Sequence, residues 1–168
     1  MSGRLDTEYV EYVTGRHAWL RRVAYLLCQD WHSADDLVQL AFIRLFTHWA
    51  RARRVDNLDA YVRMILVRVF LGERRKFWET RVLLAPTPPE GVSAGIDRDA
   101  MMDVRHALLA VPPRQRATLV LRYYCDLDVE AAAAALGCSA GTVKSQTARG
   151  LAAMRRALEP SAGGADRG

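Results

Sequence analysis

The segment from Leu136 to Leu158 carries four cationic side chains and no acidic one: Lys144, Arg149, Arg155 and Arg156. The chain has 19 acidic residues among 168, so an acid-free stretch of this length departs from its average composition. Guanidinium and ammonium groups bind phosphate oxygens through charge-assisted hydrogen bonds. The segment therefore indicates either a nucleic-acid-binding surface or the plainer alternative, a solvated helix face.

A second basic segment lies between residues 60 and 81. It contains two acidic residues, Glu73 and Glu79, and six cationic ones: Arg63, Arg68, Arg74, Arg75, Lys76 and Arg81. The net charge of +5 and the isoelectric point of about 9.4 are compatible with an anionic partner. Two basic segments far apart in the sequence indicate two separate phosphate-binding surfaces.

Motifs for catalysis and metal binding are lacking, so we expect no enzymatic activity, no cofactor, no metal and no small-molecule substrate. Cys28 and His32 have metal-ligand spacing, but the sequence between them is expected to break the helix, and no second pair accompanies them. Cys28, Cys125 and Cys138 form no disulfide framework and are expected to be small buried apolar residues, with a redox role for Cys138 left open. No apolar run approaches the roughly 20 residues of a membrane span, which predicts no membrane insertion and a cytoplasmic protein.

Apolar residues recur throughout at helical spacing, which predicts an all-α protein. Helices are expected from Ser33, as N-cap, to about residue 52, from 58 to 78, from 97 to 109, from 113 to 125, from 129 to 136 and from 140 to 158. "APTPPEGVSAG" lacks periodicity and is rich in proline and glycine, as linkers are. We therefore predict two small helical domains, 5–80 and 98–158, joined by a flexible linker, 81–97, and followed by a disordered tail, 159–168.

The end of the second domain has the pattern of a helix-turn-helix, a short helix, a turn with Gly137 and a longer helix capped by Ser139. In that motif the second helix enters the DNA major groove. On a helical wheel Ser145 and Arg149 face away from the packed side, with Lys144 and Ala148 beside them. Arg149 is expected to bond guanine or a phosphate, and Arg155 and Arg156 to suit the C-terminal end of the helix dipole. The alternative is a helical hairpin with a cationic exterior.

Both domains also resemble a known family. "SADDLVQLAFIRLF" and "NLDAYVRMILVRVFLGERRK" resemble the two central helices of bacterial RNA polymerase sigma factors, closest to the extracytoplasmic-function (ECF) type of the actinobacterial sigma-E-like subgroup. "ALLAVPPRQRATLVLRYYCDLDVEAAAAALGCSAGTVKSQTARGLAAMRRAL" resembles the sigma domain that reads the −35 promoter element. The resemblance covers about Tyr9 to Leu158, with both domains in the family's order.

The resemblance implies that the first domain binds core RNA polymerase at the clamp coiled coil of its largest subunit. The implied contacts are Asp35, Asp36, Leu37, Gln39, Phe42 and Arg44. A helix with polar positions beside an apolar stripe suits such docking. Asp35 and Asp36 also fit a second explanation, in which they stabilise the helix dipole.

For the −10 promoter element, the resemblance implies capture of a flipped base by the loop after residue 52 and phosphate contacts from the following helix. The implied residues are Arg53, Arg54, Val55, Asp56, Asn57, Leu58, Arg63, Arg68, Arg74 and Arg75. A pocket for an unstacked base needs amide and backbone hydrogen bonds, which makes Asn57 the leading candidate. The competing interpretation is that Asn57 only caps the next helix.

For the −35 element, the implied residues are Ser139, Thr142, Lys144, Ser145, Gln146, Ala148 and Arg149. The sequence departs from the family pattern at Leu40, Arg68 and Gln146, which puts the role of these positions in doubt; Gln146 could equally contact the preceding helix. The expected partners are core RNA polymerase, at its clamp coiled coil and flap, promoter DNA and, as a further candidate, an anti-sigma factor. The rival hypotheses are a free-standing dimeric helix-turn-helix regulator and a helical adaptor without DNA contact.

Overall fold

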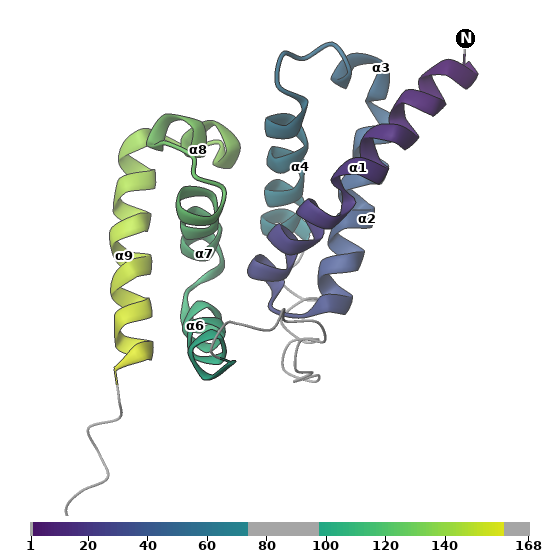
Figure 1. Cartoon of the computed structure of the whole chain (residues 1–168). Coiled ribbons are helices and arrows are strands. Elements are labelled where there is room, and N and C mark those ends of the chain that lie inside the picture. Colours follow the sequence, from purple (N-terminus) through teal and green to yellow (C-terminus); the bar gives the residue numbers. More distant parts are fainter. Residues whose placement is uncertain (1, 74–97, 160–168) are drawn as a thin grey trace, which may run out of the picture.

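The computed structural model describes residues 2–73 and 98–159, and all regular elements within these ranges are helical (Figure 1). The first module comprises α1 (Ser2–Cys28), α2 (Trp31–Thr47), α3 (Trp49–Ala52) and α4 (Leu58–Glu73). The second comprises α6 (Arg98–Ala110), α7 (Pro113–Leu119), the π-helical turn η1 (Val120–Tyr124), α8 (Val129–Leu136) and α9 (Ala140–Leu158). The predicted all-α fold with two helical modules is confirmed, while the predicted linker 81–97, the helix beyond residue 73 and the tail beyond residue 159 lie outside the described residues.

The corner between α1 and α2 differs from the prediction that Ser33 caps the second helix. The cap is Asp30, whose Oδ2 accepts hydrogen bonds from the Ser33 backbone N–H at 2.9 Å and from the Ser33 hydroxyl at 2.7 Å. Gln29 adopts a left-handed φ of 58°, which turns the chain between the two helices within two residues. Ser33 is therefore an internal, fully buried residue of α2, held by the cap.

In the second module, the residues at the helix ends have the roles that their types favour. Pro113 occupies the first helical position of α7, where its missing N–H costs nothing. Gly137 ends α8 with a φ of 68°, a conformation that favours glycine. The Ser139 side chain then accepts a hydrogen bond from the Thr142 N–H at 3.1 Å and so caps α9. Residues 129–158 thus form the predicted helix-turn-helix.

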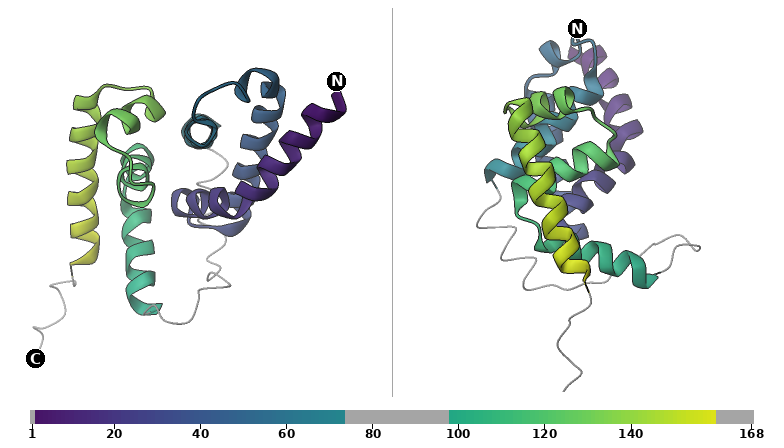
Figure 2. Two further views of the ribbon diagram at one scale, coloured as in Figure 1. Left: turned by 45° about the horizontal axis from the view of Figure 1, so that its top comes forward. Right: turned by 90° about the vertical axis from the view of Figure 1, so that its left-hand side faces the viewer.

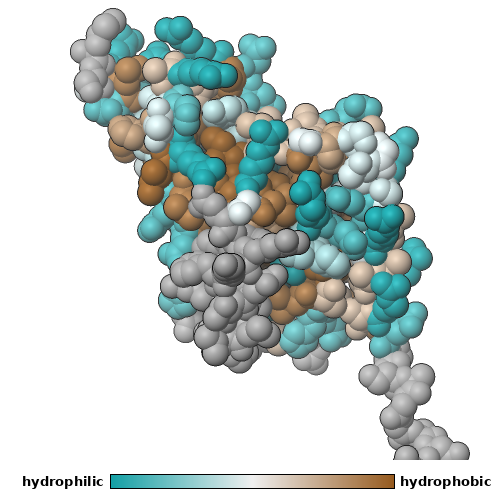
Figure 3. All heavy atoms as spheres, turned by 180° about the vertical axis from the view of Figure 1, so that it is seen from behind, coloured by the Kyte–Doolittle hydropathy of each residue, from teal (hydrophilic) through white to brown (hydrophobic). Residues whose placement is uncertain are grey.

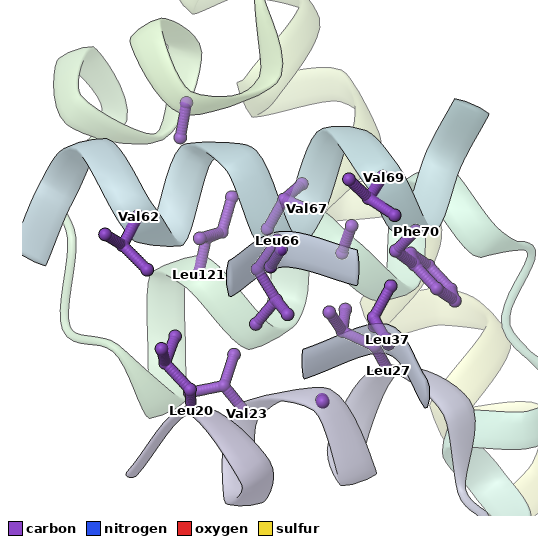
Figure 4. Packing of buried hydrophobic residues seen from close by; sticks show 14 of the residues in the cluster. Leu20, Val23, Leu27, Leu37, Val62, Leu66, Val67, Val69, Phe70 and Leu121 are labelled. Atoms are coloured by element: carbon purple, nitrogen blue, oxygen red, sulfur yellow. The ribbon is translucent and has the colours of Figure 1, made fainter. Parts of the chain in front are cut away.

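The two modules share one hydrophobic core, which the sequence did not predict. Leu121 of η1 is fully buried and lies among Leu20 of α1 and Val62 and Leu66 of α4 (Figure 4). Helix α8 packs against α4, and η1 and α7 pack against α1. Figures 1 and 2 show the modules side by side, with α9 on the outer side of the second module. In the part of the chain that the structure describes, none of the helices has the length and apolarity to cross a membrane.

Candidate nucleic-acid interface

The outward face of α9 presents a cationic surface to solvent. Lys144, Ser145, Ala148 and Arg149 are all exposed, as the helical wheel predicts. The helix stands on the side of its module away from the first module, and the right-hand view of Figure 2 shows it in front of the other elements. This face therefore combines short and cationic side chains, free of acidic neighbours on the same helix, in a position that DNA can reach.

The opposite face of α9 packs against α7 through a small residue. Val143 is fully buried, and Gly150 is buried next to Leu119. A Cβ atom at Gly150 would lie 3.0 Å from Leu119 Cδ1, so the absence of a side chain lets the two helices approach closely. This packing fixes the rotation of α9 and thereby decides which side chains face outward.

Three of the residues predicted to contact the −35 element also have structural roles. Ser139 and Thr142 form the cap of α9, and their side-chain oxygens lie 3.0 Å apart. Gln146 is only half-exposed, and its Oε1 accepts a hydrogen bond from the hydroxyl of Thr118 in α7 at 2.8 Å. The internal contact expected for Gln146 was with the preceding helix, which is α8, but the structure places it with α7; its contact with DNA stays a prediction.

The loop between α3 and α4 exposes the residues predicted to capture a base. Arg54, Val55, Asp56 and Asn57 are all exposed. The side-chain oxygen of Asn57 accepts a hydrogen bond from the Ala60 N–H at 3.0 Å, so Asn57 does cap α4, while its role in base capture stays a prediction. Capping uses one of the two lone pairs of the amide oxygen and leaves the NH2 group free to donate to a base.

Two predicted phosphate-binding residues of α4 are engaged within the protein. The Arg68 guanidinium donates to the carbonyl oxygens of Ala134 and Ala135, at 3.3 and 3.4 Å, and so binds the C-terminal end of α8. The Arg63 guanidinium lies 5.3 Å from the ring centroid of Trp19. In this arrangement both cations serve the packing around α4, and Arg74 and Arg75 lie outside the described residues.

Helix α2 presents a mixed polar and apolar surface. Not all of its residues that were predicted to bind core polymerase lie on that surface. Leu37 is fully buried in the core, so it supports α2 from within, and its assignment as a partner contact is not compatible with this structure. Asp35 pairs with Arg21 of α1 at 2.6 Å. Gln39 and Arg44 are exposed, whereas Asp36 and Phe42 are half-buried.

Sequence reasoning missed two members of this surface. Ile43 and Phe46 are large apolar residues of α2, yet they are 61% and 52% exposed. They continue the line of Gln39 at helical spacing, so α2 carries an exposed apolar stripe beside its polar positions. Seen from behind, apolar residues gather on the first module, while the second module has a more mixed surface (Figure 3).

The cysteines and histidines do not form a reactive or metal-binding centre within residues 2–73 and 98–159, where three or more potential metal ligands nowhere gather. Cys28 is buried. Burial raises the pKa of the Cys125 thiol above its ordinary value, although the Arg63 guanidinium acts in the opposite direction. A raised pKa reduces the thiolate fraction, which makes this thiol a weak nucleophile.

Comparison with known proteins assigns both modules to one class of protein. Residues 13–80 match the model of sigma-70 region 2, and residues 101–154 match that of sigma-70 region 4. The RNA polymerase sigma-E factor of Streptomyces avermitilis is 36% identical over 157 residues, which cover 90% of this chain and 86% of the relative. That of Streptomyces coelicolor is 37% identical over 159 residues, with the same coverage.

A solved structure has the same fold. The sigma factor RpoE of Bartonella quintana, crystallised in complex with the anti-sigma factor NepR, superposes with a TM-score of 0.69 at 24% sequence identity. The match covers 92% of this chain and 98% of the other. The fold and the helix-turn-helix thus define a two-module DNA-binding protein of the sigma-70 class. The chain belongs to the ECF sigma factors, among which it resembles the sigma-E factors of Streptomyces.

Proposed function

We propose that this protein uses its two modules on two different parts of a promoter, the −10 element for the first and the −35 element for the second. As an ECF sigma factor it is a non-enzymatic initiation factor that binds core RNA polymerase and directs it to promoters. The polymerase supplies the chemistry. The sigma factor contributes binding energy for promoter choice and strand separation.

The exposure of two separate surfaces on different modules supports the proposal that each module binds a different promoter element. The outer face of α9 presents Lys144, Ser145 and Arg149, which suits a major groove. The loop at residues 53–57 presents the amide of Asn57 and the apolar side chain of Val55, which suit an unstacked base. One surface can therefore read duplex DNA while the other holds a separated strand.

We further propose that the exposed stripe of α2, with Gln39, Ile43 and Phe46, docks on the polymerase clamp. Side chains at this spacing form one helix face, and an apolar centre with a polar border is the composition of protein interfaces. The second module would dock on the flap. Such a protein acts on the polymerase in the cytoplasm. The relative from Bartonella quintana was crystallised with an anti-sigma factor, and we propose an inhibitor of that class as a further partner here.

The test is transcription in vitro with purified core polymerase and a library of promoter sequences. We expect the protein to bind core polymerase and to select promoters with defined −10 and −35 elements. A free-standing dimeric regulator would behave differently, because it binds paired half-sites without polymerase. Binding to palindromic DNA alone, combined with failure to bind core polymerase, would refute the proposed function.

A further inference from the structure

The loop that presents Asn57 is tied to α1 at both of its ends. At the first end, Arg53 pairs with Glu8 of α1, with Nη1 and Oε2 3.2 Å apart. At the other end, Asp59 accepts hydrogen bonds from the Tyr12 hydroxyl at 2.8 Å and from Arg16 Nε at 2.9 Å. The second carboxylate oxygen of Asp59 lies 2.8 Å from Arg16 Nη2, so the Arg16 fork engages both oxygens.

The part of α1 that makes these contacts is itself held against α2 and α3. The Tyr9 hydroxyl donates to the Phe42 carbonyl oxygen at 2.8 Å, and the Tyr9 ring packs edge-on against Phe46 and Trp49. Trp49 is 6% exposed and also contacts the ring of Tyr12. The N-terminal half of α1 is therefore a supported element, able to hold what it contacts in place.

Between its two anchors the loop is held by backbone hydrogen bonds and by the cap that Asn57 forms with the Ala60 N–H. Its first N–H groups, those of Arg53, Arg54 and Val55, donate to carbonyl oxygens of α3 at 2.9 to 3.2 Å. Its central side chains point to solvent. The loop thus has fixed ends and an exposed centre, which is the arrangement of a preorganised binding loop.

We propose that the N-terminal half of α1 is a brace that holds loop 53–57 open for an unpaired −10 base, with Glu8, Tyr12, Arg16 and Asp59 as positioning residues. The inference rests on the proposed function and deepens it. It also changes the role of Arg53: the carboxylate of Glu8 engages this guanidinium, so Arg53 anchors the loop rather than contacting phosphate.

The two acidic residues give the sharpest test, because general electrostatics and the brace predict opposite signs. Removing a carboxylate near DNA lowers repulsion and strengthens binding if charge alone matters. The brace predicts that Glu8→Gln and Asp59→Asn each weaken binding. The matched control is Glu11→Gln, which makes the same charge change at an exposed position of α1.

The DNA-binding measurement uses the full chain with core polymerase and two probes from a promoter chosen by transcription in vitro. One probe is a single-stranded oligonucleotide of the −10 element, and the other is a duplex of the −35 element. We expect Glu8→Gln and Asp59→Asn to lower affinity for the single strand about threefold to tenfold and to leave the duplex unchanged, with Glu11→Gln neutral or slightly tighter. Equal behaviour of all three variants, or equal loss on both probes, would overturn the proposal.

Hydrogen exchange of the full chain alone provides a second measurement that does not depend on the proposed function. We expect faster exchange at residues 53–57 in Glu8→Gln, Asp59→Asn and Arg16→Gln than in Glu11→Gln, with the core of α2 unchanged. The double variant Arg16→Gln/Asp59→Asn should exchange no faster than Asp59→Asn alone, because the contact that Arg16 makes with Asp59 is already weakened in that single variant. Unchanged exchange in the loop would refute the brace. Failure of the wild type to initiate transcription would instead refute the proposed function.

Discussion

The four cations of α9 divide by their position along the helix. Lys144 and Arg149 lie on the outward face of its first half, whereas Arg155 and Arg156 occupy the last turn. Cations in the last turn interact favourably with the negative end of the helix dipole. We therefore expect base reading to be confined to the first half of the helix, although the whole segment is basic.

Arg149→Ala tests this division. If Arg149 binds the edge of a guanine with two hydrogen bonds, its loss should cost about 1–3 kcal/mol and relax base preference at one position of the −35 element. Affinities for a set of singly substituted −35 duplexes measure both effects, with Arg156→Ala as the control. A uniform loss across all duplexes would make Arg149 a phosphate contact.

Tyr12 gives a prediction about pH. Burial, and next the hydrogen bond to Asp59, raise the pKa of its hydroxyl above the ordinary value of 10.0, so the folded protein retains a proton that the unfolded chain loses. The stabilisation by Tyr12 should be complete below about pH 10 and should decline as the pH rises further. Urea unfolding of the wild type and Tyr12→Phe at about pH 8 and about pH 11 tests the sign. The difference in unfolding free energy should shrink at the higher pH, and a constant difference would contradict the argument.

At the scale of elements, helix caps set where the helices begin and in which direction they leave each turn. Asp30 starts α2 from a buried position, with 4% of its surface exposed, while Asp128 starts α8 from an exposed one. Both carboxylates accept a backbone N–H in the first turn, at 2.9 and 2.8 Å. Only Asp30 also accepts from a buried hydroxyl, that of Ser33. The α1–α2 corner is therefore more sensitive to its cap than the start of α8.

Comparison of Asp30→Ala with Asp128→Ala tests this difference. Loss of an exposed cap should lower the free energy of unfolding by about 1 kcal/mol. Asp30→Ala should cost about 2 kcal/mol or more, because the Ser33 hydroxyl is then left buried without this acceptor. Denaturant unfolding of both variants measures the two losses. Equal losses would show that the buried hydroxyl finds another acceptor.

A second pair of variants concerns the packing of α9. Glycine within a helix costs about 1 kcal/mol relative to alanine, so Gly→Ala in open space should stabilise. A Cβ at Gly141 would meet its nearest atom at 3.8 Å, whereas at Gly150 it would meet buried Leu119 at 3.0 Å. We therefore expect Gly150→Ala to be less stable than Gly141→Ala by about 1 kcal/mol or more. Thermal or chemical unfolding of the two variants measures this difference in stability. Equal stability would show that Leu119 can move aside.

At the scale of the whole molecule, arginines of each module bind helix ends of the other. Arg116 of α7 is 9% exposed and donates to the Leu27 carbonyl oxygen at the end of α1 at 2.7 Å. Arg105 of α6 donates to the Gln29 carbonyl oxygen at 2.8 Å. Arg68 of α4 binds the end of α8. These bonds use Nε and Nη2 of Arg68, so a contact of this exposed side chain with a phosphate of the −10 element has to use Nη1 or break the bonds to α8.

Arg68→Ala should weaken the contact between the modules without unfolding either one. Two long hydrogen bonds from a guanidinium are expected to contribute about 1 kcal/mol, which corresponds to roughly fivefold faster amide exchange in residues 131–138. Exchange in α2 should stay unchanged. Arg54→Ala removes an exposed cation from the same module and serves as the control. Unaltered exchange in α8 would show that apolar packing alone holds the modules together.

Local patterns in the sequence are sufficient to predict the helices, the helix-turn-helix and the family. Helical periodicity, Pro113, Gly137 and Ser139 act over a few residues, so they predict helices, their ends and the helix-turn-helix without knowledge of the fold. The outward face of α9 was also predictable, because a helical wheel needs only the spacing of apolar residues.

The fold sets the features that depend on contacts between distant residues. It buried Leu37 and exposed Ile43 and Phe46, because the side of α2 that packs inward is set by α1 and α4. It places Arg68 in hydrogen bonds with residues 66 and 67 positions away in the chain. It also places Gln146 in a hydrogen bond with a residue 28 positions away. It also placed Glu8 and Asp59 at the two ends of the loop through the path of α1. Charge patterning reveals that a surface is basic, but only the fold determines which cations remain available to DNA.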